Sequence, residues 1–105
     1  MQSAHSTLRQ VNAMFFRGKP AQFDFLVTQG VVDAISSEEG SEFLVRHFNG
    51  DWGDIDSVDR QINEQSITSG VRNVFSQYTA RSGSVVNIVS GYGRITMRLS
   101  HELVF

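Results

Sequence analysis

The hydrophobic pattern of the chain changes its period near residue 70. Between residues 28 and 70, apolar positions recur at the three- and four-residue spacing of amphipathic helices. Beyond that point they alternate with polar positions, most regularly where Ile95, Met97 and Leu99 are separated by polar residues. Helices followed by hairpins are the order typical of an α+β domain.

Polar breaks divide the helical part of the pattern into three segments. Thr28 can cap the first segment through its hydroxyl, and Ser37 or Glu38 begins the second. Asn49-Gly50 ends the second segment, because both residues tolerate the left-handed backbone region.

The third segment begins among polar residues and ends at Gly70. Its candidate N-caps are Asp54, Asp56 and Ser57. Its buried side is expected to carry Ile55, Val58 and Ile62. The sequence therefore predicts a helix that packs on the core through an apolar stripe.

The strands expected in the C-terminal third span residues 71–79, 84–90 and 94–99. The turns between them, at 81–83 and 91–93, are short enough to impose antiparallel pairing, so the three strands should form a meander. A further strand is expected near residues 23–27, after a hairpin turn at residues 18–20.

These elements predict a single α+β domain over residues 22–105. Two or three helices pack on one face of a three- to four-stranded antiparallel sheet with a C-terminal β-meander. Residues 1–21 form an N-terminal extension that can add a strand or hairpin. Apolar clusters at 14–16 and 103–105 leave homo-oligomerisation open, because exposed apolar segments are usually docked on something.

The composition narrows the classes of function. The chain has 105 residues and no cysteine, which excludes disulfides, cysteine-based zinc sites and thiol catalysis. Nine Lys and Arg against 11 Asp and Glu give a net charge of −2, which disfavours a general nucleic-acid binder with a basic face. The apolar runs are too short for a membrane span, and the first residues do not read as a secretory signal. We therefore expect a cytoplasmic protein without a membrane partner.

Candidate functional side chains are most concentrated between Arg46 and Asp54, around the only Trp of the chain. In a functional interpretation, His47, Asp51 and Asp54 gather a divalent metal or supply a general base. In a structural interpretation, the glycines permit turns, the aspartates bond turn amides and Trp52 fills the core. Arg46 then pairs with Asp51 or Asp54. We favour the structural interpretation, because Gly-Asp turns beside helix caps are common; no catalytic residue, metal ligand or cofactor is assigned.

A set of residues in this region also carries a resemblance: Arg46, His47, Gly50, Asp51, Trp52, Gly53, Asp54, Asp59, Asn63, Glu64, Ser76 and Tyr78. With them, the chain from about Thr28 onward resembles a family of small proteins common on bacterial plasmids and other mobile elements. It departs from the family's final hairpin at residues 90–94. The resemblance implies a mobile-DNA context in a bacterium and no defined biochemical activity.

Two charged surfaces are further candidates for binding. The third helix carries Asp59 and Asn63, and its charges either pair on a solvated face or meet a basic partner. Arg94 and Arg98 lie on one side of the last strand. With Tyr78 or Tyr92 nearby, such a face can bind single-stranded nucleic acid. Spaced arginines on a sheet nevertheless pair more often with carboxylates across strands.

The sequence thus favours a non-enzymatic, macromolecule-binding accessory protein of a mobile element. Its expected partner is an unidentified protein, such as a host DNA-acting or defence protein. One alternative is a metal-dependent hydrolase acting on nucleotides or nucleic acid through His47, Asp51 and Asp54. Another is nucleic-acid binding by the arginine-bearing sheet face. The candidate binding residues are Arg46, His47, Asp51, Trp52, Asp54, Asp59, Asn63, Tyr78, Arg94 and Arg98.

Overall fold

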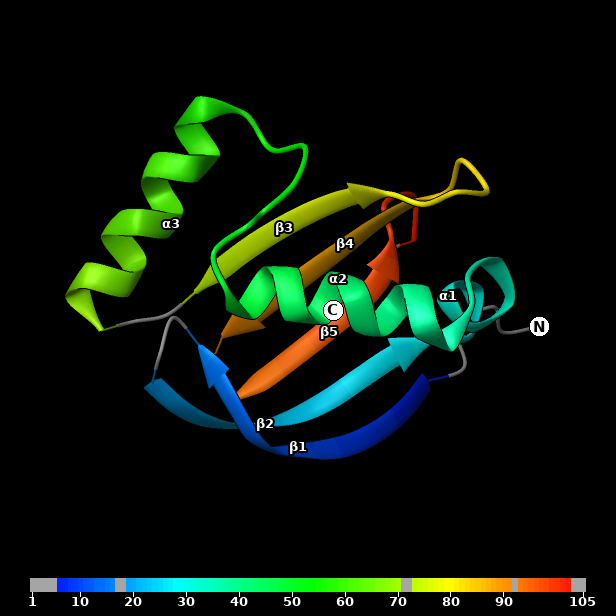
Figure 1. The fold of residues 1–105 in the computed structure, drawn as a ribbon, viewed down its shortest axis with the longest axis horizontal. Helices are drawn as coiled ribbons and strands as arrows, with labels where there is room; N and C mark the ends of the chain where they lie inside the picture. The colour runs from blue at the N-terminus through cyan, green and yellow to red at the C-terminus, as the bar shows by residue number, and fades with distance from the viewer. Residues whose placement is uncertain (1–5, 17–18, 71–72, 92, 103–105) are drawn as a thin grey trace.

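A computed structural model describes residues 6–16, 19–70, 73–91 and 93–102. The elements of this part are β1(Ser6–Phe16), β2(Lys19–Thr28), α1(Gln29–Ala34), α2(Ser37–Phe48), α3(Ser57–Ser69), β3(Val74–Thr79), β4(Val85–Gly91) and β5(Arg94–Leu99). Helices α1 and α2 cross one face of the curved sheet, and α3 stands beside β3 (Figure 1). None of the helices in the described ranges has the length and apolar character needed to cross a bilayer.

The strands form one sheet in the order β1-β2-β5-β4-β3. Strands β3, β4 and β5 make the expected antiparallel meander, and the fold is α+β as predicted. The prediction of three to four antiparallel strands is wrong in two respects: the sheet has five strands, and β2 pairs with β5 in parallel.

The parallel pair follows from the path of the chain. The chain leaves β2, passes through α1, α2 and α3, and enters the sheet again at the far edge, in β3. The meander then returns toward β2, so that β5 arrives beside it in the same direction. Two parallel neighbouring strands require a long crossover of this kind. Short turns in the sequence predict pairing only between strands that follow each other in the chain, so they did not predict the pairing of β2 with β5.

The N-terminal strands form the expected hairpin. They pair antiparallel from Ser6 opposite Thr28 to Phe16 opposite Lys19, with a register shift between Val11 and Met14. The strand expected at 23–27 lies within β2. The turn was expected at residues 18–20, and its first residue, Gly18, lies outside the described residues. The extension thus becomes the outermost strand of the sheet.

Local capping sets the helix boundaries. The Thr28 side chain accepts from the Val31 N–H at the start of α1, as expected. Of the three candidate caps of α3, Asp56 caps it by accepting from the Asp59 N–H, and Gly70 ends it with a φ of 83°. These ends are predictable because each cap needs only neighbouring residues.

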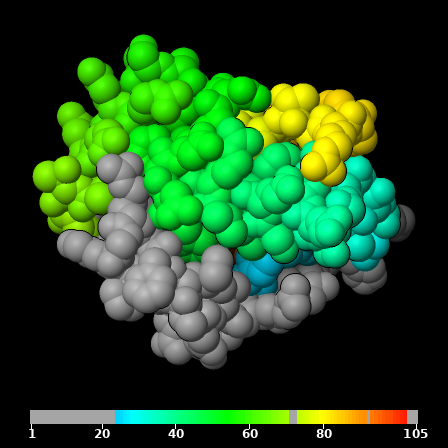
Figure 2. Space-filling model, viewed as in Figure 1, coloured from blue at the N-terminus to red at the C-terminus, as the bar shows by residue number. Residues whose placement is uncertain are grey.

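The apolar core lies between the sheet and the two helices that cross it. Large side chains from all these layers are buried: Phe25, Val31, Phe43, Phe48, Trp52, Val86, Ile88, Ile95 and Met97. On the helix-covered side of the molecule, α1, α2 and α3 form a continuous surface (Figure 2). The opposite face of the sheet carries none of the described helices.

Helix α3 does not bury the apolar stripe that the sequence predicts. Ile55, before the helix, is buried, but Val58 and Ile62 are 61% and 54% exposed. The buried residue of α3 is instead Asn63, at 2% exposure. The helix therefore attaches to the sheet through a polar side chain, beside the partly buried Ile67. Helical periodicity of apolar residues does not reveal such a polar contact.

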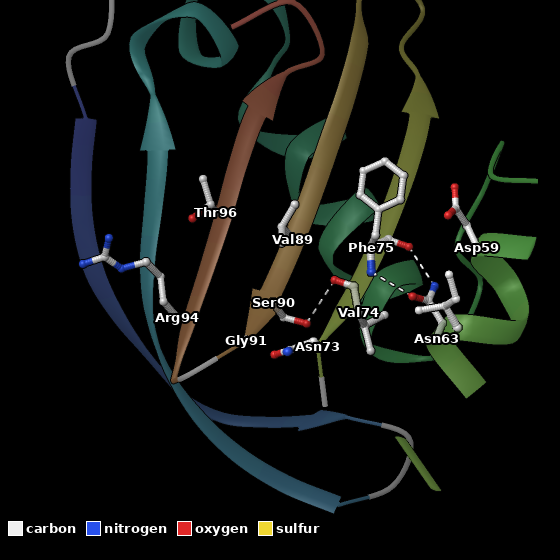
Figure 3. Close-up of a pocket in the computed structure, with 11 residues that line it drawn as sticks. Asp59, Asn63, Asn73, Val74, Phe75, Val89, Ser90, Gly91, Arg94 and Thr96 are labelled. Carbon is white, nitrogen blue, oxygen red and sulfur yellow. Dashed lines mark hydrogen bonds between the residues drawn. The ribbon is translucent and has the colours of Figure 1, made fainter. Parts of the chain in front are cut away.

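The Asn63 side chain makes the hydrogen bonds to β3 that a neighbouring strand would make. Its Nδ2 donates to the Phe75 carbonyl (2.8 Å), and its Oδ1 accepts from the Phe75 N–H (3.1 Å), as Figure 3 shows. One side-chain amide thus satisfies both outward backbone groups of an edge-strand residue. Unpaired groups of this kind would otherwise offer a template for another strand.

Asn63→Ala is expected to lower the free energy of unfolding by about 2 kcal/mol, because it removes both hydrogen bonds to Phe75. Urea denaturation of the whole chain measures the change. Gln65→Ala, at an exposed position of the same helix, is the matched control and should stay within about 0.5 kcal/mol of the unmodified protein. Equal stabilities of the two variants would contradict this role of Asn63.

Candidate functional site

The central motif forms the end of α2 and the connector to α3. Asn49 is the C-cap of α2, and its N–H donates back into the last turn of the helix. Gly50 and Gly53 then take φ values of 81° and 72°. Because L side chains rarely adopt this region, the two glycines let the connector turn back toward β3.

The connector pairs with the outer edge of β3. The Gln77 N–H donates to the Trp52 carbonyl (3.1 Å), and the Asp54 N–H donates to the Gln77 carbonyl (2.7 Å). Gly53 forms a parallel bridge with Gln77 at this point. A Cβ atom on Gly53 would collide with the Gln77 carbonyl oxygen and the Tyr78 ring, so the close approach requires glycine. The connector and Asn63 together close the edge of β3 at Gln77 and Phe75.

Tyr78 joins the motif to the core. Its hydroxyl donates to the Asp51 carbonyl (2.8 Å), and its ring stacks on Phe43 with centroids 4.7 Å apart. The Arg46 guanidinium lies 4.6 Å from the centre of the same ring. Burial raises the pKa of Tyr78 to about 12. The suggestion that Tyr78 assists an arginine-bearing sheet face is therefore wrong, since this ring lies in the core with α2.

Arg46 and Asp51 form the ion pair that the sequence suggests. Arg46 Nε and Nη2 donate to the two carboxylate oxygens of Asp51 at 2.7 and 3.2 Å. This contact lowers the pKa of Asp51 and raises that of Arg46. Both side chains are largely exposed, so the pair fixes the loop more than it stabilises the fold.

His47 is enclosed in the core. Its side chain is fully buried, its Nδ1 contacts the Ser76 hydroxyl, and its Nε2 lies 3.1 Å from the Ser90 hydroxyl. Desolvation lowers the pKa of His47 to about 3, so the ring is neutral at pH 7. A neutral imidazole donates through one nitrogen and accepts through the other, and rotating hydroxyls can satisfy both. The two serines come from separate strands, which is why the sequence did not pair them with His47.

The residues proposed for hydrolysis do not come together. His47 contacts serines in the core, Asp51 pairs with Arg46, and Asp54 accepts from the Thr79 hydroxyl at 3.1 Å. In the described part of the chain, no group of three His, Asp or Glu side chains could hold a metal ion. With Trp52 also 1% exposed, this geometry corresponds to the structural interpretation of the motif.

The other candidate residues gather on the open face of the sheet. A groove of about 370 Å³ runs between α3 and the exposed sides of β3, β4 and β5. Asp59 stands on its α3 side and Arg94 on its β5 side, with Phe75, Val89 and Thr96 between them (Figure 3).

The groove combines apolar surface with balanced charge. Ile62 is 54% exposed and Val89 37% exposed, whereas Asp59 and Arg94 mark opposite sides of the groove. Asp24 lies opposite Arg94 in the strand register. The face is therefore neither strongly basic nor strongly acidic.

Arg98 lies on the same face as Arg94, as the alternation predicts, but its guanidinium already makes a hydrogen bond within the chain. Its Nη1 donates to the Glu102 carbonyl at 2.9 Å. The Glu102 carboxylate in turn accepts from the Thr28 hydroxyl and the Leu99 N–H. Arg98 thus belongs to the turn after β5, and Arg94 is the freer of the two cations.

Comparison of the chain with protein-family models, with curated proteins and with solved structures gives no match in any of the three.

The burial of His47 predicts a pH dependence of stability. The folded state holds the pKa near 3, below the ordinary value of 6.5, so between these values the unfolded chain binds more protons. The free energy of unfolding should therefore fall as pH drops below about 6.5, by up to about 1.4 kcal/mol per pH unit from this group. Denaturation of the unmodified protein and of His47→Gln between pH 7 and 4 separates this contribution from that of the carboxylates.

His101→Gln, at an exposed position, is the matched control for the replacement of a histidine by glutamine outside the core. The NMR shifts of the His47 ring provide a second measurement, which does not depend on the variant folding. A His47 ring that titrates near pH 6.5 in the native protein would refute the prediction.

Proposed function

We propose that the protein is a non-enzymatic module that binds a protein partner through the groove between α3 and the open sheet face. The observation that carries the proposal is the exposed apolar surface of Ile62 and Val89 beside a face that none of the described helices covers. Exposed apolar side chains that lie next to each other, with polar residues around them, are typical of interaction sites.

The arrangement of the central motif supports a binding role over catalysis. His47 is buried and neutral, and both of its ring nitrogens contact hydroxyl groups. Asp51 and Asp54 are engaged by Arg46 and Thr79 at the surface. An enzyme needs an acid, base or ligand that reaches its substrate, and these groups are held as parts of the fold.

The charge of the groove favours a protein over a nucleic acid. A nucleic-acid site gains most of its affinity from cations placed along the phosphates. Here Arg94 shares the face with Asp24 and Asp59, and Arg98 is bound to a backbone carbonyl. Apolar surface with an ion of each sign beside it suits a protein surface of mixed character. The resemblance to proteins of mobile elements makes a host DNA-acting or defence protein the first partner to test.

The proposal predicts that Ile62→Glu abolishes partner binding. The tagged protein and its variants are used to capture proteins from a nuclease-treated bacterial lysate in high salt. We expect a protein that the unmodified chain retains and Ile62→Glu loses, because a buried, unpaired carboxylate opposes binding.

Val32→Glu is the matched control, since Val32 is also 54% exposed but lies on α1, on the other side of the sheet. It should retain the same partner, and circular dichroism checks that both variants fold. Equal retention by both variants would contradict the assignment of the groove. Capture of nucleic acid alone, lost with Arg94→Ala and increasing salt, would favour the alternative of an arginine-bearing binding face.

A further inference from the structure

The groove on the open sheet face has a self-complementary arrangement of charge. A carboxylate, Asp59, stands on one side of its apolar floor, and a guanidinium, Arg94, stands on the other (Figure 3). Neither side chain has an ion-pair partner among residues 24–70, 73–91 and 93–102, whose side chains the structure describes. A surface that carries one charge of each sign on opposite sides matches a copy of itself that is rotated by half a turn.

We propose that a second copy of this chain occupies the groove in a two-fold arrangement, with Asp59 of each copy facing Arg94 of the other. The rotation places the apolar side chains of one copy, Ile62 and Val89, over those of its mate. Val58, one helical turn before Ile62 and 61% exposed, extends this surface along α3. Isologous contacts of this kind are the commonest route to closed dimers.

The edge of β3 favours this face-to-face contact over strand addition on that side. The Phe75 backbone is bonded to Asn63, and the Gln77 backbone is bonded to the connector at Trp52 and Asp54. A second copy that approaches β3 at Phe75 and Gln77 therefore finds no free backbone groups there. On this side of the sheet the groove offers contact instead, by burial of apolar surface and by charge.

The inference rests on the proposed function, because it names an occupant of the same groove. Self-association would then regulate access, since a partner protein must displace the second copy. Its test uses the purified chain alone, so that a failure of self-association is separate from a failure of partner capture.

Sedimentation equilibrium of the whole chain, over a range of concentrations, measures the dissociation constant of the dimer. Asp59→Arg and Arg94→Asp should each weaken the dimer about tenfold or more, because each turns two attractive contacts of the dimer into repulsive ones. The double variant, Asp59→Arg with Arg94→Asp, should restore the affinity to near that of the unmodified chain. Ile62→Glu should abolish the dimer, and Val32→Glu should leave it unchanged.

Three results would overturn the proposal. The first is a chain that is monomeric at every concentration; partner capture that still depends on Ile62 would then leave the proposed function standing. The second is a dimer that is insensitive to Ile62→Glu, which would place the contact elsewhere, such as at β1. The third is a dimer that both single reversals weaken and the double reversal does not restore, which would exclude the pairing of Asp59 with Arg94.

Discussion

The closure of the outer edge of β3 is the interaction on which the rest of the structure depends. The Asn63 amide pairs with the Phe75 backbone, and the connector at Trp52–Asp54 pairs with Gln77. These bonds satisfy the outward backbone groups of Phe75 and Gln77, although β3 is the last strand on this side of the described sheet. They also hold the connector and α3 against the sheet, because the connector follows α2 and Asn63 lies in the middle of α3.

This closure determines where the molecule can bind. A helix held to the edge by a polar side chain does not need to bury an apolar stripe, so Val58 and Ile62 remain exposed. The open face of the sheet then becomes the floor of a groove with α3 as its wall. Since the edge of β3 has no free backbone at Phe75 and Gln77, recognition there has to use side chains.

The central motif illustrates how far residue types alone support a functional assignment. A histidine and two aspartates within eight positions suggest a metal or a general base, yet the fold directs them apart. Ser76 and Ser90, which contact the two nitrogens of the His47 ring, are far from it in sequence, and no spacing in the sequence links either serine to His47. The Arg46–Asp51 pair was predictable, because it spans one turn at the end of a helix.

The sequence by itself determined what depends on near neighbours: the cap at Thr28, the end of α3 at Gly70, and the alternation that makes β5 a strand with Ile95 inward and Arg94 outward. Only the tertiary structure decided the parallel pairing of β2 with β5, the docking of α3 through Asn63 and the enclosure of His47. The physical reason is the range of the forces involved. Capping and periodicity act over a few residues, whereas strand order, desolvation and the pairing of buried polar groups depend on segments that meet only in the folded chain.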